Sequence, residues 1–268
     1  MRVPIRGTPN LPGVLKMPVP IRSWFYASVL GAAVLGSPSP RGGSPARRDL
    51  DDPRIQIPFR VGEELNFKIK LNVLTVGTGS TRVIGVERVR GTPTFHTAFD
   101  IRGKVLFKRV DNHYESWFDT TNMVSLRHVQ QVADGEHENK EYEFYPDRKT
   151  YVRNGEEKPS VAKPLDEGSF LFYLRSLPLT PGKTYTIGRY YNAERNPIVI
   201  TVVRRERLRV PAGEFDAILI HPVLKSHGLF AEDAHAEVWV ADDGRRTLLK
   251  LRSGLPVGTL DMELTARE

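Results

Sequence analysis

Residues 166–177 read D-E-G-S-F-L-F-Y-L-R-S-L, and beyond the first 50 residues this is the one stretch that clearly predicts a helix. Asp166 can cap the first turn by accepting hydrogen bonds from backbone N–H groups, and Glu167 places a negative charge where the helix dipole favours an anion. Pro178 ends the helix because proline cannot continue the backbone hydrogen-bond ladder. Apolar side chains surround the helix on nearly every side, so we expect it to be buried.

The flanking sequence has a hydrophobic period of two, which predicts strands with one buried face and one solvated face. In residues 65–73, for example, apolar residues alternate with Asn and Lys. Residues 77–80, Asp111-Asn112 and Asn154-Gly155 are expected turns, and the last is a strong hairpin signal. About a dozen short strands separated by turns favour an antiparallel sheet that closes or folds over. The prediction is an all-β fold, a strongly curved antiparallel sheet or open barrel, with one short buried helix (166–177).

The chain divides into a leader and a body. Residues 1–50 resemble a signal or targeting segment followed by a linker: 24–36 form an apolar run preceded by Arg22, and 38–48 are rich in Pro, Gly, Ser and Arg. The run has the length of a secretory signal core and is shorter than the roughly 20 residues of a membrane-spanning helix. No later stretch is apolar enough to span a bilayer. No linker or fixed repeat interrupts 54–268, which we expect to form a single β-rich domain.

The leader predicts export to the periplasm or cell envelope. We expect cleavage between Gly36 and Ala46, where small residues are frequent. An uncleaved N-terminal anchor is the alternative. The first 16 residues are long and proline-rich for a signal, so the true start is either Met1 or Met17.

The positive charge of the chain is confined to its leader. The full sequence has 39 Lys and Arg against 32 Asp and Glu, a formal net charge of +7. Seven of the basic residues and none of the acidic ones lie in residues 1–48, so the rest of the chain is formally neutral. This distribution argues against nucleic acid as a partner. The lack of cysteine excludes disulfides, thiolate metal sites and cysteine catalysis.

Four motifs, taken in order, resemble a known family. They are PFRVGEEL at 58–65, the helix at 166–179 with its LRSLPL ending, VPAGEF at 210–215 and AEVWVADDGRR at 236–246. Together they span about 55–266, and the chain is similar to the bacterial exported family catalogued as domain of unknown function 3108. The resemblance implies an envelope location and a β-rich fold. It implies no activity and supplies no catalytic residues.

The polar side chains form no recognisable catalytic or metal-binding motif. His137-Glu138 begins a partial match to the zinc-protease motif H-E-x-x-H, but the second histidine is missing and the segment lies beside a turn. The adjacent carboxylates Glu63-Glu64 are expected to be solvated. Three histidines match no zinc-ligand spacing: His221, His227 and His235. We therefore predict no catalytic residue, no metal site and no cofactor.

Large apolar side chains are abundant for one sheet, and two interpretations remain open. They fill the core, or some of them line a cleft for an apolar ligand between the sheet and the helix. The ligand-contact candidates are Phe170, Phe172, Tyr173 and Arg175. Arg175 could meet an anionic head group, extend to solvent or pair with a carboxylate.

Three functional hypotheses follow from these observations. The first is a non-catalytic binding or carrier module for a lipid-like or otherwise apolar ligand. The alternative is an envelope structural or interaction module with an envelope protein as its partner. An enzyme ranks last, because it needs a converging polar cluster that the sequence does not reveal.

Overall fold

One antiparallel sheet dominates the structure. The computed structural model describes residues 55–267, apart from 106–107, 134–136, 226–229, 231–233 and 257. The predicted targeting segment and linker lie outside these residues. Within the described chain, the sheet has 14 strands and is accompanied by one α-helix, α1 (Glu167–Ser176). The predicted all-β fold with one short buried helix is confirmed.

The order of the strands in the sheet nearly follows their order in the chain. It runs β8-β7-β6-β5-β4-β3-β2-β1-β14-β13-β12-β11-β10-β9, so the first and last strands pair in the middle and β8 and β9 are the edges. The strands are β1 (Glu64–Leu71), β2 (Leu74–Val89), β3 (Thr92–Val105), β4 (Lys108–Asp119), β5 (Ser125–Ala133), β6 (His137–Tyr145), β7 (Thr150–Arg153), β8 (Glu156–Pro159), β9 (Thr184–Ile187), β10 (Ile198–Val210), β11 (Gly213–Val223), β12 (Glu237–Ala241), β13 (Leu248–Leu255) and β14 (Gly258–Arg267). Two 3-10 helices are η2 (Pro146–Arg148) and η3 (Ala193–Arg195).

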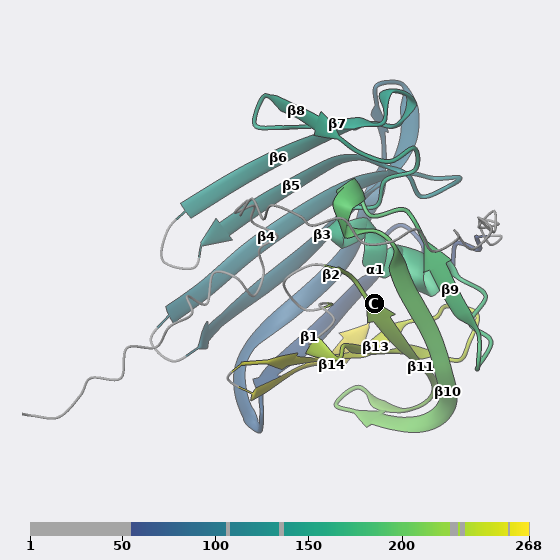
Figure 1. The fold of residues 1–268 in the computed structure, drawn as a ribbon. Coiled ribbons are helices and arrows are strands. Elements are labelled where there is room, and N and C mark those ends of the chain that lie inside the picture. Colours follow the sequence, from purple (N-terminus) through teal and green to yellow (C-terminus); the bar gives the residue numbers. More distant parts are fainter. Residues whose placement is uncertain are drawn as a thin grey trace, which may run out of the picture.

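Helix α1 belongs to the connection between the two edges of the sheet. Because β8 and β9 are consecutive in the chain, residues 160–183 must pass from one edge to the other, and they carry α1 on the way. Figure 1 shows the sheet curving around α1. A twisted sheet of this many strands curls rather than staying flat, and α1 covers part of its concave side.

One predicted turn is wrong because its glycines have another role. The segment that begins at Gly77 lies inside β2, and the chain turns earlier, at Asn72 and Val73. Asn72 adopts the left-handed conformation (φ 56°), and Val73 is 88% exposed. Gly77 faces Gly103 across β2 and β3, where an added Cβ would lie 2.3 Å from the carbonyl oxygen of Arg102. These glycines therefore allow close strand approach.

The expected turn at Asp111-Asn112 is also wrong, since both residues lie inside β4. The buried Asn112 accepts a hydrogen bond through its side-chain oxygen from the backbone N–H of Ala133 at 3.3 Å, so its amide supports the pairing of β4 with β5. The Asn154-Gly155 turn is confirmed. Its two residues have φ values of 50° and 87°, the left-handed conformations that this tight hairpin requires.

The close approach at Gly77 generates a stability prediction. We expect Gly77→Ala to lower the free energy of unfolding by about 2–3 kcal/mol, because the new methyl group would press against the backbone of β3. Gly85→Ala is the matched control, since a Cβ there meets nothing within 4 Å, and it should change stability by less than about 0.5 kcal/mol. Urea unfolding of both variants measures the difference, and equal effects would contradict the packing role of Gly77.

Candidate functional site

The N-terminus of α1 is held by a buried network of polar side chains. The Asp166 carboxylate accepts hydrogen bonds from the backbone N–H groups of Gly168 (2.8 Å) and Ser169 (2.9 Å), which confirms the predicted cap. It also accepts one from the Ser116 hydroxyl of β4 at 2.7 Å. The backbone N–H of Asp166 donates to the Ser125 hydroxyl of β5 at 3.1 Å. The cap therefore also fastens the helix to two strands.

Ser116, His128 and Asp166 have the composition of a catalytic triad but not its geometry. In a triad, the serine and the carboxylate bind opposite nitrogens of the imidazole. Here the same nitrogen, His128 Nδ1, lies 3.0 Å from the Ser116 hydroxyl, 3.5 Å from the Asp166 carboxylate and 2.7 Å from the carbonyl oxygen of Glu115. All three side chains are fully buried. The cluster positions the helix, and sequence patterns did not reveal it because its members come from separate elements.

The predicted ligand-contact residues are buried among side chains of the same chain. The Phe172 ring lies 4.9 Å from the ring of Phe59 and 5.7 Å from that of Phe118, which extends from β4. Phe170 meets Phe230 at 5.4 Å. The guanidinium of Arg189 lies 4.7 Å from the centre of the Tyr173 ring. These contacts pack α1 against β4 and the adjoining loops, and ligand contact by Phe170, Phe172 and Tyr173 stays a prediction.

Arg175 pairs with a carboxylate, which is one of the three alternatives considered for it. Its two terminal nitrogens donate to both oxygens of Glu63 at 2.6 and 2.9 Å, and its Nε donates to the carbonyl oxygen of Arg246 at 2.8 Å. Arg175 is 2% exposed and Glu63 8%. The expectation of a solvated Glu63 is therefore wrong. This carboxylate lies just before β1, 112 residues from its partner, and local sequence patterns do not reveal pairs at such a separation.

A groove of about 680 Å³ opens at the rim of the sheet, and no residue of α1 lines it. We call it the rim groove. It is formed by the turns between β2 and β3 and between β4 and β5, by the end of β6 with η2, and by Ala162. Half of its lining residues are apolar or aromatic, and the other half are polar and include two arginines and two aspartates: Val89, Val124, Leu126, Phe144, Tyr145, Pro146, Ala162, Arg90, Arg148, Asp119, Asp147, Thr92, Thr121 and Asn122. Local sequence patterns do not reveal this site, because each hairpin contributes only a few residues.

The walls of the rim groove are held by side-chain contacts. The Asp119 carboxylate accepts hydrogen bonds from three backbone N–H groups of its turn at 2.6–2.8 Å. Arg90 pairs with Glu143 and donates to the carbonyl oxygen of Phe144 at 2.6 Å. The guanidinium carbons of Arg90 and Arg148 lie 4.7 and 4.1 Å from the centre of the Tyr145 ring. The groove is therefore largely preformed.

A chain of imidazoles and carboxylates lies on the face of the sheet opposite to α1. His96 bridges Glu87 (2.8 Å) and Glu115 (2.6 Å), and His113 bridges Glu115 and Asp100 (both 2.8 Å). Burial disfavours charge on His113, but its hydrogen bonds to Glu115 and Asp100 outweigh burial and raise its pKa above 6.5. Burial likewise opposes charge on Asp100 and Glu115, but the histidine partners lower the pKa of each carboxyl below its ordinary value.

Neither a metal centre nor a membrane-crossing helix is found among the described residues. No group of three or more His, Cys, Asp or Glu side chains in this part of the chain is arranged to hold a metal ion. No helix of the described ranges is long and apolar enough to cross a membrane. His227 lies outside the described residues, so the structure does not place the three histidines together.

Comparisons with known proteins identify a family and a related fold. The model of the family described as protein of unknown function (DUF3108) matches residues 66–265. No curated protein matches the chain. A solved structure of a beta-barrel-like protein of domain of unknown function DUF1849 from Brucella abortus is similar, with 8% identity, a TM-score of 0.50, and coverage of 78% of this chain and 97% of that chain. That likeness concerns the fold alone.

Two other solved structures match at lower TM-scores. A candidate lipoprotein from Parabacteroides distasonis has 8% identity and a TM-score of 0.36, with 81% of this chain and 100% of that chain covered. A candidate exported protein with a YmcC-like fold from Bacteroides fragilis has 13% identity and a TM-score of 0.29, with 80% and 99% covered.

Loss of one partner of the Arg175–Glu63 pair should destabilise the fold strongly. We expect Arg175→Met and Glu63→Leu each to cost about 3–5 kcal/mol, because each leaves a buried charge without its partner, while the double variant costs clearly less than the sum. The exposed pair Arg207–Asp216 (2.9 Å) is the control, and its substitutions should change stability far less, because solvent screens exposed charges. Denaturant unfolding gives all the values. Additive effects at Arg175 and Glu63 would contradict a coupled buried pair.

The histidine–carboxylate chain predicts a pH optimum of stability. Charged His113 stabilises the fold fully below 6.5 and loses this contribution as the pH rises through its raised pKa. Ionised Asp100 and Glu115 contribute above 4.5 and lose this as the pH falls through their lowered pKa values. Urea midpoints should therefore peak at about pH 5–6.

His113→Gln should flatten the decline of stability on the alkaline side of this optimum. His221→Gln should leave the decline intact, because His221 lies outside the chain of bridged groups, 3.5 Å from Glu237. An unchanged alkaline decline in His113→Gln would contradict the assignment.

Proposed function

The chain belongs to the DUF3108 family of proteins of unknown function. We propose that it is an exported, non-catalytic module that binds a lipid-like ligand in the rim groove. The observation that carries the proposal is the groove itself. Its volume of about 680 Å³ lies within the roughly 300–1,000 Å³ of typical ligand sites, and its lining places apolar side chains beside polar and charged ones, as an amphipathic ligand requires. The apolar run at residues 24–36 supports export.

The two ends of such a ligand have different partners in the groove. An acyl chain would lie against Val89, Val124, Leu126 and Ala162. Each methylene removed from water contributes about 0.8 kcal/mol, which corresponds to roughly a fourfold change in Kd. The exposed Arg148 is paired with Glu157 at 3.2 Å, and because exposed pairs are weak, its guanidinium can exchange this partner for an anionic head group.

The rim groove competes with the space beneath α1 as the binding site. A ligand in direct contact with Phe170, Phe172, Tyr173 and Arg175 would have to displace the packing of Phe172 and separate a buried ion pair. Breaking such a pair costs about 3–5 kcal/mol, whereas the groove is open without rearrangement. The groove therefore accommodates the ligand at lower cost.

Filling the groove with a large side chain should weaken ligand binding. We expect the wild-type protein to bind saturated fatty acids, with Kd falling about fourfold per added methylene until the groove is full. Ala162→Trp should weaken binding at least tenfold, because the exposed Ala162 lines the groove and a large side chain there occupies it. Ala193→Trp, an equally exposed alanine in η3 that does not line the groove, is the control.

Displacement of a fluorescent fatty acid measures these affinities, and native mass spectrometry with palmitate gives the stoichiometry. Chain-length-dependent binding that survives Ala162→Trp would move the ligand out of the groove. Absence of fatty-acid binding to the wild-type protein would overturn the proposed function.

A further inference from the structure

A second, smaller cavity lies beside the Arg175–Glu63 pair. Its volume is about 140 Å³, and its lining comes from the segment before β1, the turn between β12 and β13, and the end of β14. The residues that line it are Ile57, Pro58, Phe59, Arg60, Glu63, Leu65, Gly244, Arg245, Thr247 and Arg267. We call it the arginine pocket. None of these residues lines the rim groove, so this site is independent of the proposed function.

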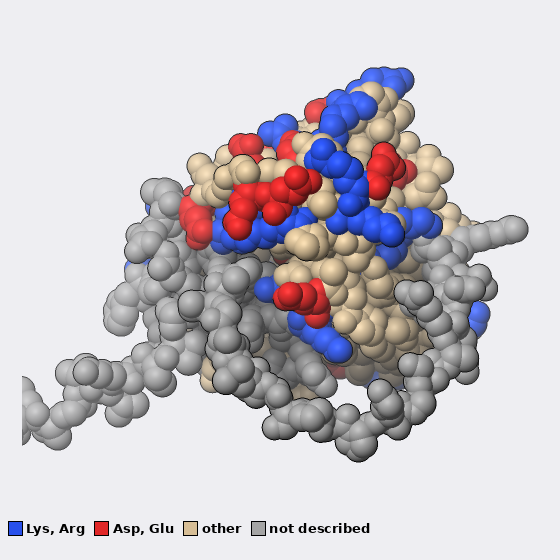
Figure 2. All heavy atoms as spheres, turned by 45° about the horizontal axis from the view of Figure 1, so that its top comes forward, with Lys and Arg blue, Asp and Glu red and all other residues tan. Residues whose placement is uncertain are grey.

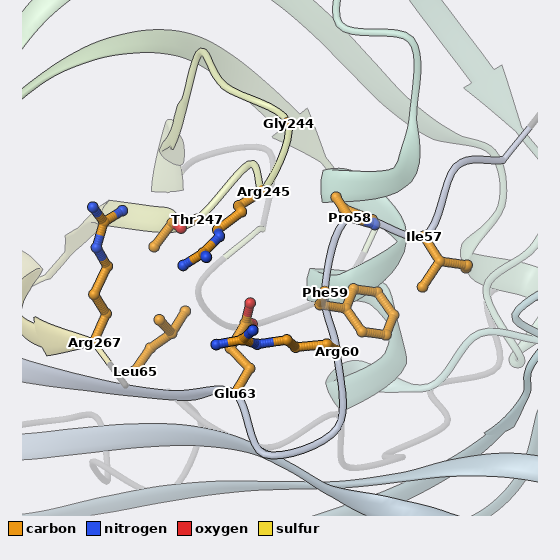
Figure 3. A pocket seen from close by; sticks show the side chains of 10 residues that line it. All are labelled: Ile57, Pro58, Phe59, Arg60, Glu63, Leu65, Gly244, Arg245, Thr247 and Arg267. Carbon is orange, nitrogen blue, oxygen red and sulfur yellow. The ribbon is translucent and has the colours of Figure 1, made fainter.

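We propose that the arginine pocket binds a phosphate group, either free or as the head group of a lipid. Figure 3 shows Arg60, Arg245 and Arg267 on different sides of the pocket, with Glu63 between them. Each arginine comes from a different part of the chain, and the fold brings them to one opening. Figure 2 shows one face of the molecule, on which Lys and Arg side chains gather in patches beside groups of Asp and Glu.

The single carboxylate in this lining is already neutralised. Both oxygens of Glu63 accept hydrogen bonds from Arg175, which is buried and does not line the pocket. Among the described residues, the side chains of Arg60 and Arg245 make no hydrogen bond or ion pair, and Arg267 lies over the Phe215 ring at 5.4 Å. The lining therefore has three guanidinium charges that no carboxylate of the pocket offsets.

The nearby acidic residues are engaged elsewhere. Asp242 pairs with Arg205 at 2.6 Å. The Asp243 carboxylate accepts hydrogen bonds from the backbone N–H groups of Arg245 and Arg246 at 2.9 and 2.8 Å, which holds the turn that presents Arg245. The positive potential of the pocket is therefore retained, and the turn beside it is ordered.

The shape and surroundings of the pocket suit a phosphate group. Its volume exceeds the roughly 30 Å³ that one water molecule occupies in the liquid, and it leaves no room for an acyl chain. Planar guanidinium groups bind phosphate oxygens through paired N–H donors. The neighbouring Phe59 and Leu65 are buried apolar residues, and their low polarity strengthens charge–charge attraction. The hydroxyl of the buried Thr247 adds a neutral donor to the lining.

Titration calorimetry with the full-length protein at constant ionic strength tests the proposal. The probes are inorganic phosphate and dihexanoyl phosphatidic acid, a short lipid that carries the same group. We expect the wild-type protein to bind at least one of them at a single site. Binding of both identifies the phosphate group as the shared determinant, whereas binding of phosphatidic acid alone identifies a lipid head group.

Substitutions of lining residues distinguish binding of phosphate in this pocket from nonspecific electrostatic binding to the protein surface. Arg60→Gln together with Arg245→Gln should weaken binding at least tenfold, and both residues are exposed, so the protein should still fold. Arg209→Gln removes an equally exposed charge outside the pocket and should leave the affinity unchanged. Ala162→Trp in the rim groove should leave phosphate binding intact even if fatty-acid binding is lost or was never present. Equal affinities of the wild-type and the Arg60→Gln/Arg245→Gln proteins, or no binding of either probe, would overturn the proposal.

Discussion

The buried ion pair between Arg175 and Glu63 connects helix α1 to the segment before β1, two parts of the structure that are far apart in the chain. Glu63 precedes β1, in the middle of the sheet, while Arg175 lies on the helix that crosses from one edge strand to the other. The crossing segment makes backbone hydrogen bonds to strands near its two ends, but its helical part, α1, is not a rung of the sheet and needs side-chain contacts to align it. The pair supplies that alignment at one end of α1, and the Asp166 network with Ser116 and Ser125 supplies it at the other. Between these two anchors, the aromatic side chains of the helix pack into the curve of the sheet.

This arrangement decides where the molecule has room for a ligand. The space between α1 and the sheet is occupied by packed rings such as those of Phe59, Phe118 and Phe172, so that helix and sheet form a common core. The open spaces lie where hairpins end. Turn residues are not held by the hydrogen bonds between strands, so several turns can direct their side chains towards one groove or pocket. The fold thus separates a stabilising interior from two rim sites, one with a mixed apolar and polar lining and one rich in arginine.

The sequence predicted those features that depend on local chemistry. The helix has the expected cap at Asp166, and the Asn154-Gly155 hairpin and the alternating burial of β1 follow from residues close together in the chain. The errors share one cause. Gly77 reads as a turn residue, and its actual role depends on Gly103 in another strand. The environment of Glu63 depends on Arg175, and both rim sites depend on hairpins from different parts of the sheet, so their residues meet only after the sheet has formed.

Two features are central to the proposed function: α1 stays docked on the sheet, and the ligand binds outside it. A crystal structure of the protein with bound palmitate tests this most directly. We predict an acyl chain in the rim groove between Val89 and Ala162, with Arg175 still bound to Glu63 and Phe172 still packed on Phe59. An acyl chain between α1 and the sheet, with the helix displaced and the Arg175–Glu63 pair separated, would contradict it.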